Sequence, residues 1–172
     1  DDNAWLIKAL ETGEMEWNEP FGVDALVPGD EAYYDEQARD VQVTADGYVL
    51  AGYTHSVGAG DFDAWLIKTD GAGQKQWDKT HGGGAWDQTD AVVLTADGGY
   101  ALTGMSRNLG GYFQAWLLKT DGGGVEEWSR FFGDPSGEEW GYCLQPAADE
   151  GYILAGSTTA GGPQAYLVYH KP

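Results

Sequence analysis

A six-residue segment that recurs four times along the chain limits the fold of this protein more than any other feature. The chain has 172 residues, and the copies are Asn3-Ala-Trp-Leu-Ile-Lys8, Asp63-Ala-Trp-Leu-Ile-Lys68, Gln114-Ala-Trp-Leu-Leu-Lys119 and Gln164-Ala-Tyr-Leu-Val-Tyr169. About 50 to 60 residues separate successive copies. This period is too long for the coils of a parallel β-helix and is typical of one small sheet per repeat.

Two further sets of residues keep the same order in every repeat. In the first set, a glycine stands four residues before a tryptophan, and the pairs are Gly13 with Trp17, Gly73 with Trp77, and Gly124 with Trp128. The second set is an acidic turn that leads into an apolar run ending in glycine, with its turns at 46–48, 97–100 and 149–152 and its glycines at Gly52, Gly104 and Gly156. Because independent markers stay in register, the repeat extends over nearly the whole chain.

Each repeat reads as four strands joined by turns. In the complete unit around residue 100, strands are expected at Thr89–Thr95, Tyr100–Ser106, Ala115–Lys119 and Glu127–Phe132. The segments between them are rich in glycine and aspartate, which form tight turns. The chain contains 27 Gly and 8 Trp, in keeping with turns and half-buried pleated surfaces. The pattern predicts an antiparallel meander without helices.

The second and third strands of each repeat are apolar on both faces, so both faces must be covered. Sheets that stack face to face around an axis provide this cover. The predicted fold class is therefore all-β, with β-propeller blades that are four-stranded antiparallel meanders of a period near 50 residues. The chain supplies about three such blades plus a terminal strand.

A single array is expected over residues 1–172. Its parts are a half blade at 1–22, blades at 36–82 and 87–133, and an incomplete blade at 138–172, with an inserted acidic loop at 23–35. Propellers have four to eight blades, and the terminal segments here are apolar, so something should cover them. The two alternatives are self-association into a homo-oligomer or polymer, and further blades on a longer chain.

The charge of the chain argues against several classes of partner. Its formal net charge is −19, so nucleic acids and anionic membranes would be repelled. No segment approaches the length of apolar sequence that spans a bilayer. Such acidity fits either a high-salt environment or binding of divalent cations outside the cell. The expected location is extracellular or at the cell surface.

No catalytic residues are predicted. The three histidines, His55, His81 and His170, form neither a nucleophile-base pattern nor a metal-ligand spacing. No cofactor is expected, apart from calcium as an alternative at Asp61 and Asp63, which lack the rest of a calcium-loop signature. The protein is interpreted as a non-enzyme.

The aromatic residues divide into structural and ligand-binding candidates. Repeated tryptophans are first a packing signal, and those assigned to docking between blades are Trp17, Trp77, Trp128, Trp5, Trp65 and Trp116. Trp86 and Trp140 do not recur in every repeat, so they are candidates for contact with a carbohydrate. Tyr33 and Tyr34 in the inserted loop are candidates for a ligand or interface contact.

The motif Asp63-Ala-Trp-Leu-Ile-Lys-Thr-Asp-Gly71, together with Thr95-Ala-Asp-Gly-Gly-Tyr100, resembles the β-propeller repeats of secreted and cell-surface proteins of bacteria and archaea. This resemblance implies an extracellular scaffold or adhesion role and no family-wide catalytic residues. The segment Ala9–Trp17 is similar to the tryptophan-docking motif of quinoprotein dehydrogenase propellers, which implies a packing role for its tryptophan without implying the quinone.

These observations lead to one functional prediction and two alternatives. The prediction is a non-catalytic extracellular structural or adhesive β-propeller that assembles through its blade edges. The first alternative is a carbohydrate-binding, lectin-like propeller. The second is an enzyme of the quinoprotein type.

Overall fold

The computed structural model of the protein describes residues 2–22, 35–107, 111–134, 136–148 and 151–161, and the backbone of residues 164–170. All regular elements in these ranges are β-strands, so the prediction of an all-β fold without helices is confirmed for the described residues. The strands are β1 (Ala4–Ala9), β2 (Met15–Phe21), β3 (Glu36–Thr44), β4 (Gly47–Thr54), β5 (Asp63–Asp70), β6 (Lys75–His81), β7 (Asp87–Leu94), β8 (Tyr100–Ser106), β9 (Gln114–Thr120), β10 (Glu126–Phe132), β11 (Glu139–Pro146), β12 (Tyr152–Thr158) and β13 (Gln164–His170).

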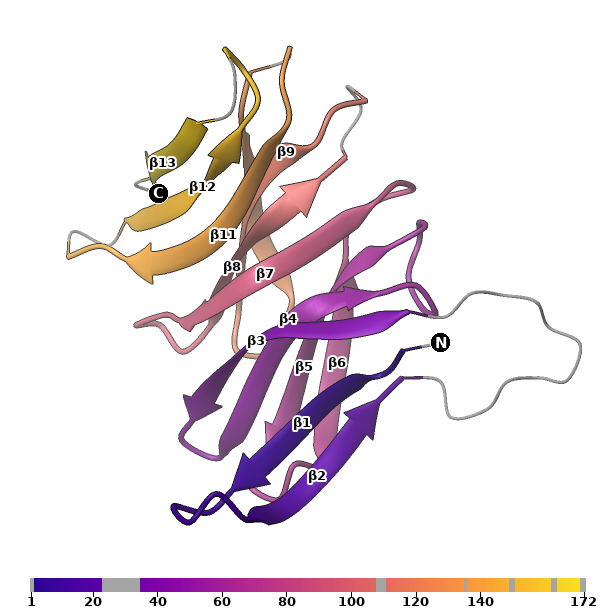
Figure 1. The fold of residues 1–172 in the computed structure, drawn as a ribbon. Coiled ribbons are helices and arrows are strands. Elements are labelled where there is room, and N and C mark those ends of the chain that lie inside the picture. Colours follow the sequence, from indigo (N-terminus) through magenta and orange to yellow (C-terminus); the bar gives the residue numbers. More distant parts are fainter. Residues whose placement is uncertain are drawn as a thin grey trace, which may run out of the picture.

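The strands form four antiparallel sheets in chain order (Figure 1). Sheet I contains β1 and β2, sheet II contains β3 to β6, sheet III contains β7 to β10, and sheet IV contains β11 to β13. Within every sheet, each strand pairs with its neighbour in the sequence, so every sheet is a simple meander. The repeat period is therefore the length of one four-stranded sheet with its connections.

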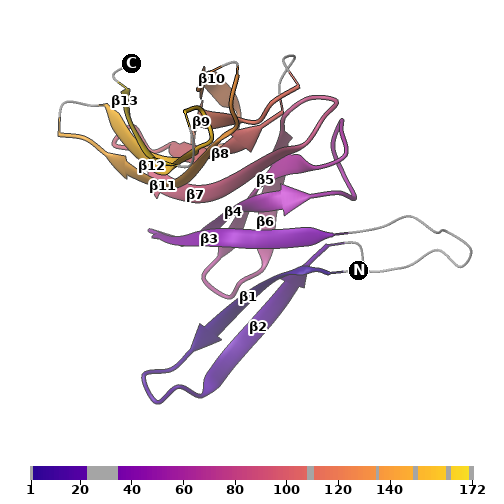
Figure 2. The same ribbon diagram turned by 45° about the horizontal axis from the view of Figure 1, so that its top comes forward.

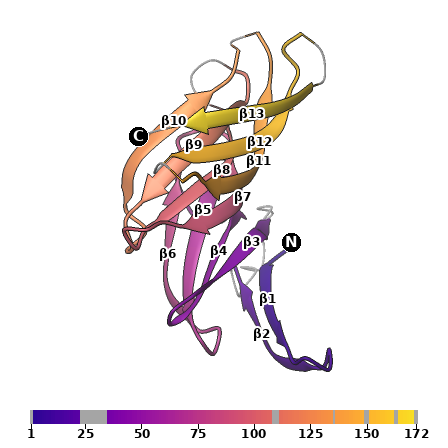
Figure 3. The same cartoon turned by 90° about the vertical axis from the view of Figure 1, so that its left-hand side faces the viewer.

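The sheets are stacked on one another, with sheets I and IV at opposite ends (Figures 1 and 2). Strand β7, which opens sheet III, contacts both β3 and β11, which open the sheets on either side. A view from the side shows the same order of sheets (Figure 3). Because neighbouring sheets cover both faces of β5 and β8, β8 is buried along its whole length, as is β5 up to its last residue.

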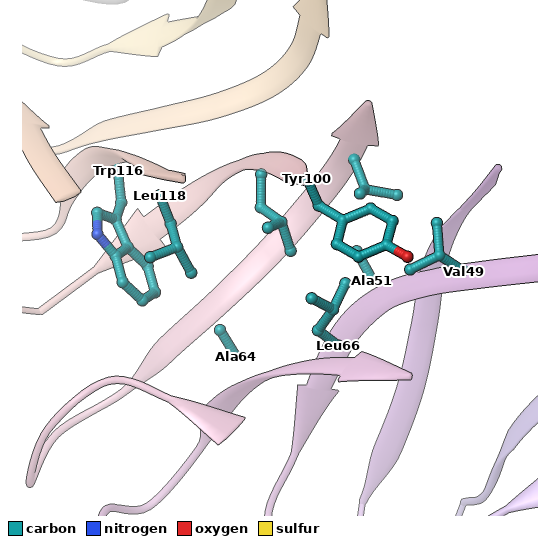
Figure 4. Close-up of a cluster of buried hydrophobic side chains, with 9 residues drawn as sticks. Val49, Ala51, Ala64, Leu66, Tyr100, Trp116 and Leu118 are labelled. Carbon is teal, nitrogen blue, oxygen red and sulfur yellow. The ribbon is translucent and has the colours of Figure 1, made fainter. Parts of the chain in front are cut away.

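Three apolar clusters hold the stack together, one between each pair of adjacent sheets. The central cluster joins sheets II and III and contains Val49, Ala51, Ala64, Leu66, Val92, Tyr100, Leu102, Trp116 and Leu118 (Figure 4). Sheets I and II share the cluster of Ala4, Leu6, Phe21, Leu50, Trp65 and Ile67. Sheets III and IV share the cluster of Ala91, Val93, Ala101, Leu117, Leu144, Tyr152 and Leu154. Burial of these side chains is the main source of stability for the stack.

Tryptophans on the outer strands link each sheet to the next. The indole of Trp17 lies over Gly73, where a Cβ atom would stand 2.7 Å from Cζ3 of the ring. Trp77 lies over Gly124 in the same way, at 2.6 Å. Both glycines have a positive φ and close the turn between the third and fourth strands of the following sheet. The turn therefore requires glycine both for its backbone conformation and for the indole above it.

A buried lysine lies near the end of the third strand in sheets II and III. Nζ of Lys68 lies 2.8 Å from Oδ1 of Asp46, and Nζ of Lys119 lies 2.9 Å from Oδ2 of Asp97. Lys119 also contacts Oε2 of Glu127 at 2.8 Å. Each aspartate belongs to the turn between the first two strands, so the ion pairs hold that turn against the third strand.

We expect the ion pair of Asp97 to make stability depend on pH. A hydrogen bond from Thr95 and another from Lys119 lower the pKa of Asp97 to about 2. Because this pKa lies below its value in the unfolded chain, the stabilisation is present above about pH 4 and is lost as the pH falls to about 2. Asp97→Asn should therefore lower the melting temperature near neutral pH, and the difference from the wild type should disappear near pH 2. A difference that persists unchanged in acid would contradict this assignment.

Candidate functional site

A row of aromatic rings crosses the stack at the end where the first strand of each sheet begins. Phe62 and Trp86 are stacked with their ring centroids 4.5 Å apart, Trp86 meets Phe113 at 6.0 Å, and Phe113 meets Trp140 at 6.3 Å. Trp86 and Trp140, the two tryptophans predicted as candidates for carbohydrate contact, thus belong to one continuous row. Trp86 lies in the connection between β6 and β7, whereas Trp140 lies within β11.

Backbone hydrogen bonds between sheets set the position of this row. The amide of Asp87 donates to the carbonyl of Phe62 at 2.7 Å, and the amide of Glu139 donates to the carbonyl of Phe113 at 2.9 Å. Each bond joins the start of the third strand in one sheet to the start of the first strand in the next. The aromatic residues are half-buried and pack on one another, so their common role is to seal the junctions between sheets.

The first strand of sheets II, III and IV begins with a buried acidic residue. Glu36, Asp87 and Glu139 occupy this position and are each at most 3% exposed. Hydroxyl groups at the end of the second strand contact them, with Thr54 donating to Glu36 at 3.1 Å and Thr158 to Glu139 at 2.8 Å. Burial raises the pKa of Asp87, which accepts a 2.7 Å bond from the amide of Gly83. These contacts make the acids structural links between strands.

A pocket opens beside the aromatic row, between sheets II and III. Its volume is about 640 Å³. One wall is the connection from β6 to β7, and the other consists of side chains on the outer strands of sheet III. We call it the Trp116 pocket, and the side chains that matter here are those of Ser106, Arg107, Trp116, Glu126, Ser129 and Phe131.

The indole nitrogen of Trp116 distinguishes this pocket from the corresponding places in the other sheets. Nε1 of Trp5 donates to Asn18 at 3.2 Å, and Nε1 of Trp65 donates to Asp78 at 2.9 Å. In sheet III the corresponding position is Ser129, as the pairings Ile67 with Asp78 and Leu118 with Ser129 show.

Among the described residues, Nε1 of Trp116 has no hydrogen-bond partner, although the side chain is only 3% exposed. Figure 4 shows this nitrogen on the side of the ring that faces away from the other labelled side chains. Serine is shorter than the asparagine and aspartate of the other sheets, so Trp116 is left with an unused donor at the pocket wall.

The two ends of the stack expose apolar residues whose counterparts inside the stack are buried. Trp5 is 57% exposed, whereas the corresponding Trp65 and Trp116 are 4% and 3% exposed. At the other end, Ile153 is 40% exposed, whereas its counterparts Val49 and Ala101 are completely buried. Since these side chains hold the same places in the repeat, the difference comes from the absence of a covering sheet among the described residues.

The strand β3 shows the same effect. Val41 is 45% exposed, whereas its counterparts Val92 and Leu144 are 0% and 2% exposed. Sheet I has two strands, the equivalents of a third and a fourth strand, so β1 contacts β3 but Val41 of β3 stays uncovered. The exposed face at this end therefore extends from β1 onto β3.

The remaining predicted residues are placed as follows. Asp63 is buried and its Oδ2 accepts bonds from the amides of Ala59 and Gly60 at 2.9 and 3.0 Å, which closes the loop before β5, while Asp61 is exposed. No group of three histidine, cysteine or acidic side chains that could hold a metal occurs among the described residues. Tyr33 and Tyr34, with the rest of the inserted loop up to residue 34, lie outside the described residues.

Trp128 contacts Tyr152 of sheet IV, with ring centroids 6.0 Å apart, so it occupies the same kind of place as Trp17 and Trp77. Within the described part of the chain, no helix has the length and apolar character needed to cross a membrane. The Trp116 pocket was not predicted from the sequence. Its only sequence signal is the change from Asn18 and Asp78 to Ser129 directly after each docking tryptophan.

Comparison with known proteins places the fold but not the function. No family model matches the chain, and no curated protein matches it. A crystal structure of a protein of unknown function from Bacteroides caccae is similar, with a TM-score of 0.51 and 12% sequence identity over 98% of this chain. The chain spans 58% of the length of that protein. The likeness concerns the fold alone.

Proposed function

We propose that the protein is a non-catalytic structural module whose sheets are blades of a β-propeller type and which assembles with further copies of itself. The observation that carries the proposal is the exposure of Trp5 at 57% where Trp65 and Trp116 are buried. The same apolar position of the repeat is covered by a neighbouring sheet in sheets II and III and is uncovered in sheet I. Its exposure in sheet I therefore marks a surface that a further sheet would cover in the same way. The net charge of −19 supports a soluble role outside the cell.

The two end sheets are complementary in their strands. Sheet I corresponds to the third and fourth strands of a complete sheet, and β11 and β12 correspond to the first and second. Joining β1 and β2 of one copy to β11 and β12 of another gives a four-stranded sheet like sheets II and III. That sheet would also cover Val41 on β3, as β7 to β10 cover sheet II on its other face.

Strand β13 occupies the place that β1 of a second copy would take. The two strands are the first and last copies of the recurring segment, and β13 pairs with β12 along its whole length. Assembly therefore exchanges β13 for β1 of the neighbouring copy, in the manner of strand addition at a sheet edge.

Sedimentation of the purified chain tests the proposal. We expect oligomers at micromolar concentration, and dissociation to monomers in the double variant Trp5→Lys/Ile7→Lys. Both side chains are exposed in a single copy, so the variant should keep its monomer fold. Val125→Lys is the matched control, because Val125 is also 57% exposed but lies in the turn before β10. Added salt should strengthen association, because it screens repulsion between acidic copies.

Cysteine cross-linking tests the register of the same assembly. The pairing of Tyr53 with Ala64 in sheet II predicts that Ser157 of one copy faces Ala4 of the next. With Cys143 changed to serine, Ala4→Cys/Ser157→Cys should form disulfide-linked oligomers. Ala9→Cys/Ser157→Cys should not, since Ala9 lies at the far end of β1, beyond the reach of a disulfide. A compact monomer without cross-links would overturn the proposal.

A further inference from the structure

We propose that the Trp116 pocket binds a neutral hydroxylated ring, that is, a sugar residue of a carbohydrate. The inference is independent of assembly, because the pocket lies between sheets II and III of a single copy. Its volume of about 640 Å³ is within the usual range for small-molecule sites. The proposal rests on an aromatic wall, an unused donor and a set of polar groups around them.

The aromatic wall is formed by a stacked pair of rings. Trp116 and Phe131 are cross-strand partners, with ring centroids 6.0 Å apart and planes inclined by only 11°. Phe131 is 38% exposed and lines the pocket, so part of its ring is open to a ligand there. A flat apolar face of this kind suits the C–H face of a pyranose ring. In sheet II the position of Phe131 is held by Thr80, so this wall is particular to sheet III.

The unused N–H donor of Trp116 requires a hydrogen-bond acceptor, such as an oxygen atom, on the ligand. Nε1 of Trp116 has no partner among the described residues and is itself closed off from solvent, so a ligand oxygen reaches it only when the neighbouring Ser129 or Phe131 side chain shifts. A buried unsatisfied donor costs free energy that a bound acceptor then recovers. An alkylammonium ligand has no acceptor to offer to this N–H group. The N–H group of Trp116 therefore disfavours simple cations as ligands, even though aromatic rings and acidic side chains attract cations in general.

The other polar side chains that line the pocket suit hydroxyl groups on the ligand. The carboxylate of Glu126 accepts hydrogen bonds, the hydroxyl of Ser129 both donates and accepts, and Arg107 donates. Arg107 is held in place by a 3.1 Å bond from Nε to the carbonyl of Gly111 and by its contact with the Phe113 ring. Anions would be repelled by Glu126 and by the net charge of −19. Hydroxyl groups, which donate and accept without carrying a charge, fit this set of partners.

The test follows the indole N–H resonance of Trp116 in NMR spectra of the whole chain. The probes are the methyl glycosides of glucose, galactose and mannose and N-acetylglucosamine, each titrated separately. We expect at least one of them to shift the Trp116 signal in a saturable way. The signal is assigned by its loss in Trp116→Phe.

Two variants that place sheet II residues into sheet III serve as the decisive comparison. Ser129→Asp should give Trp116 the partner that Asp78 gives to Trp65, and should weaken binding at least about tenfold while the melting temperature stays the same or rises. Phe131→Thr copies Thr80 and should weaken binding by removing the aromatic wall. Tyr112→Ala, at an exposed aromatic outside the pocket lining, should leave binding unchanged.

Three results would overturn the inference. The first is that none of the four sugars moves the Trp116 signal. The second is that the shift persists at full strength in Ser129→Asp, which would place the sugar elsewhere. The third is a saturable shift with tetramethylammonium chloride and with none of the sugars, which would assign the pocket to cations.

Discussion

Replacing Trp77 by alanine is expected to lower the free energy of unfolding by about 3 kcal/mol, the lower end of the range for removing a large core aromatic. Trp77 packs against the central cluster of sheets II and III and covers Gly124 in the turn before β10. Its ring also meets that of Tyr100, with centroids 6.1 Å apart. Loss of the indole removes contacts on both sides of one junction and leaves a cavity between two sheets.

Chemical denaturation at a protein concentration too low for assembly measures this effect. Trp5→Ala is the matched control, because it deletes the same side chain at a position that is 57% exposed, and we expect a change of less than about 1 kcal/mol. Equal losses in the two variants would show that Trp77 does not connect the sheets. A smaller m-value in Trp77→Ala would indicate that the sheets no longer unfold together.

Replacing Gly104 by alanine is expected to cost about 3 kcal/mol, at the upper end of the usual range for overpacking. A Cβ atom at this position would stand 2.1 Å from the carbonyl oxygen of Gln88 and 2.7 Å from Cα of Thr89. The clash arises from a β-bulge between Thr89 and Ala91, which pushes the first strand toward the second. Because the contacted atoms belong to the backbone, a side-chain rotation cannot relieve them.

The same bulge stands opposite glycine in sheets II and IV. A Cβ atom at Gly52 would lie 1.8 Å from the carbonyl of Gln37, and one at Gly156 would lie 1.6 Å from that of Trp140. Gly71→Ala is the control, since its Cβ would meet nothing within 4 Å, and it should change stability by no more than about 0.5 kcal/mol. If Gly104→Ala melted like Gly71→Ala, the bulge would not be a fixed part of the sheet.

The sequence indicated the strands of the complete repeat closely because their pattern is local. The strand predicted at Tyr100–Ser106 is β8, and the one predicted at Glu127–Phe132 begins one residue earlier as β10. Alternation, tight turns and glycines act over a few residues along the chain, so they can be read without knowing the neighbours of the strand.

Contacts between repeats were not readable in this way. The sequence places Gly73 four residues before Trp77, but the indole over Gly73 belongs to Trp17 of the preceding sheet. Trp5, grouped with Trp65 and Trp116 by its motif, is exposed where they are buried. Identical motifs have different surroundings because burial depends on whether another sheet lies above them.

The sequence by itself determined that this protein is built from repeated four-stranded antiparallel units, since period, turns and apolar runs are properties of short segments. Only the tertiary structure decided which faces are covered, and that Ser129 leaves the N–H group of Trp116 without a partner at the wall of a pocket. The physical reason is that hydrophobic burial and hydrogen-bond satisfaction are settled between sheets, by residues about one repeat apart in the chain.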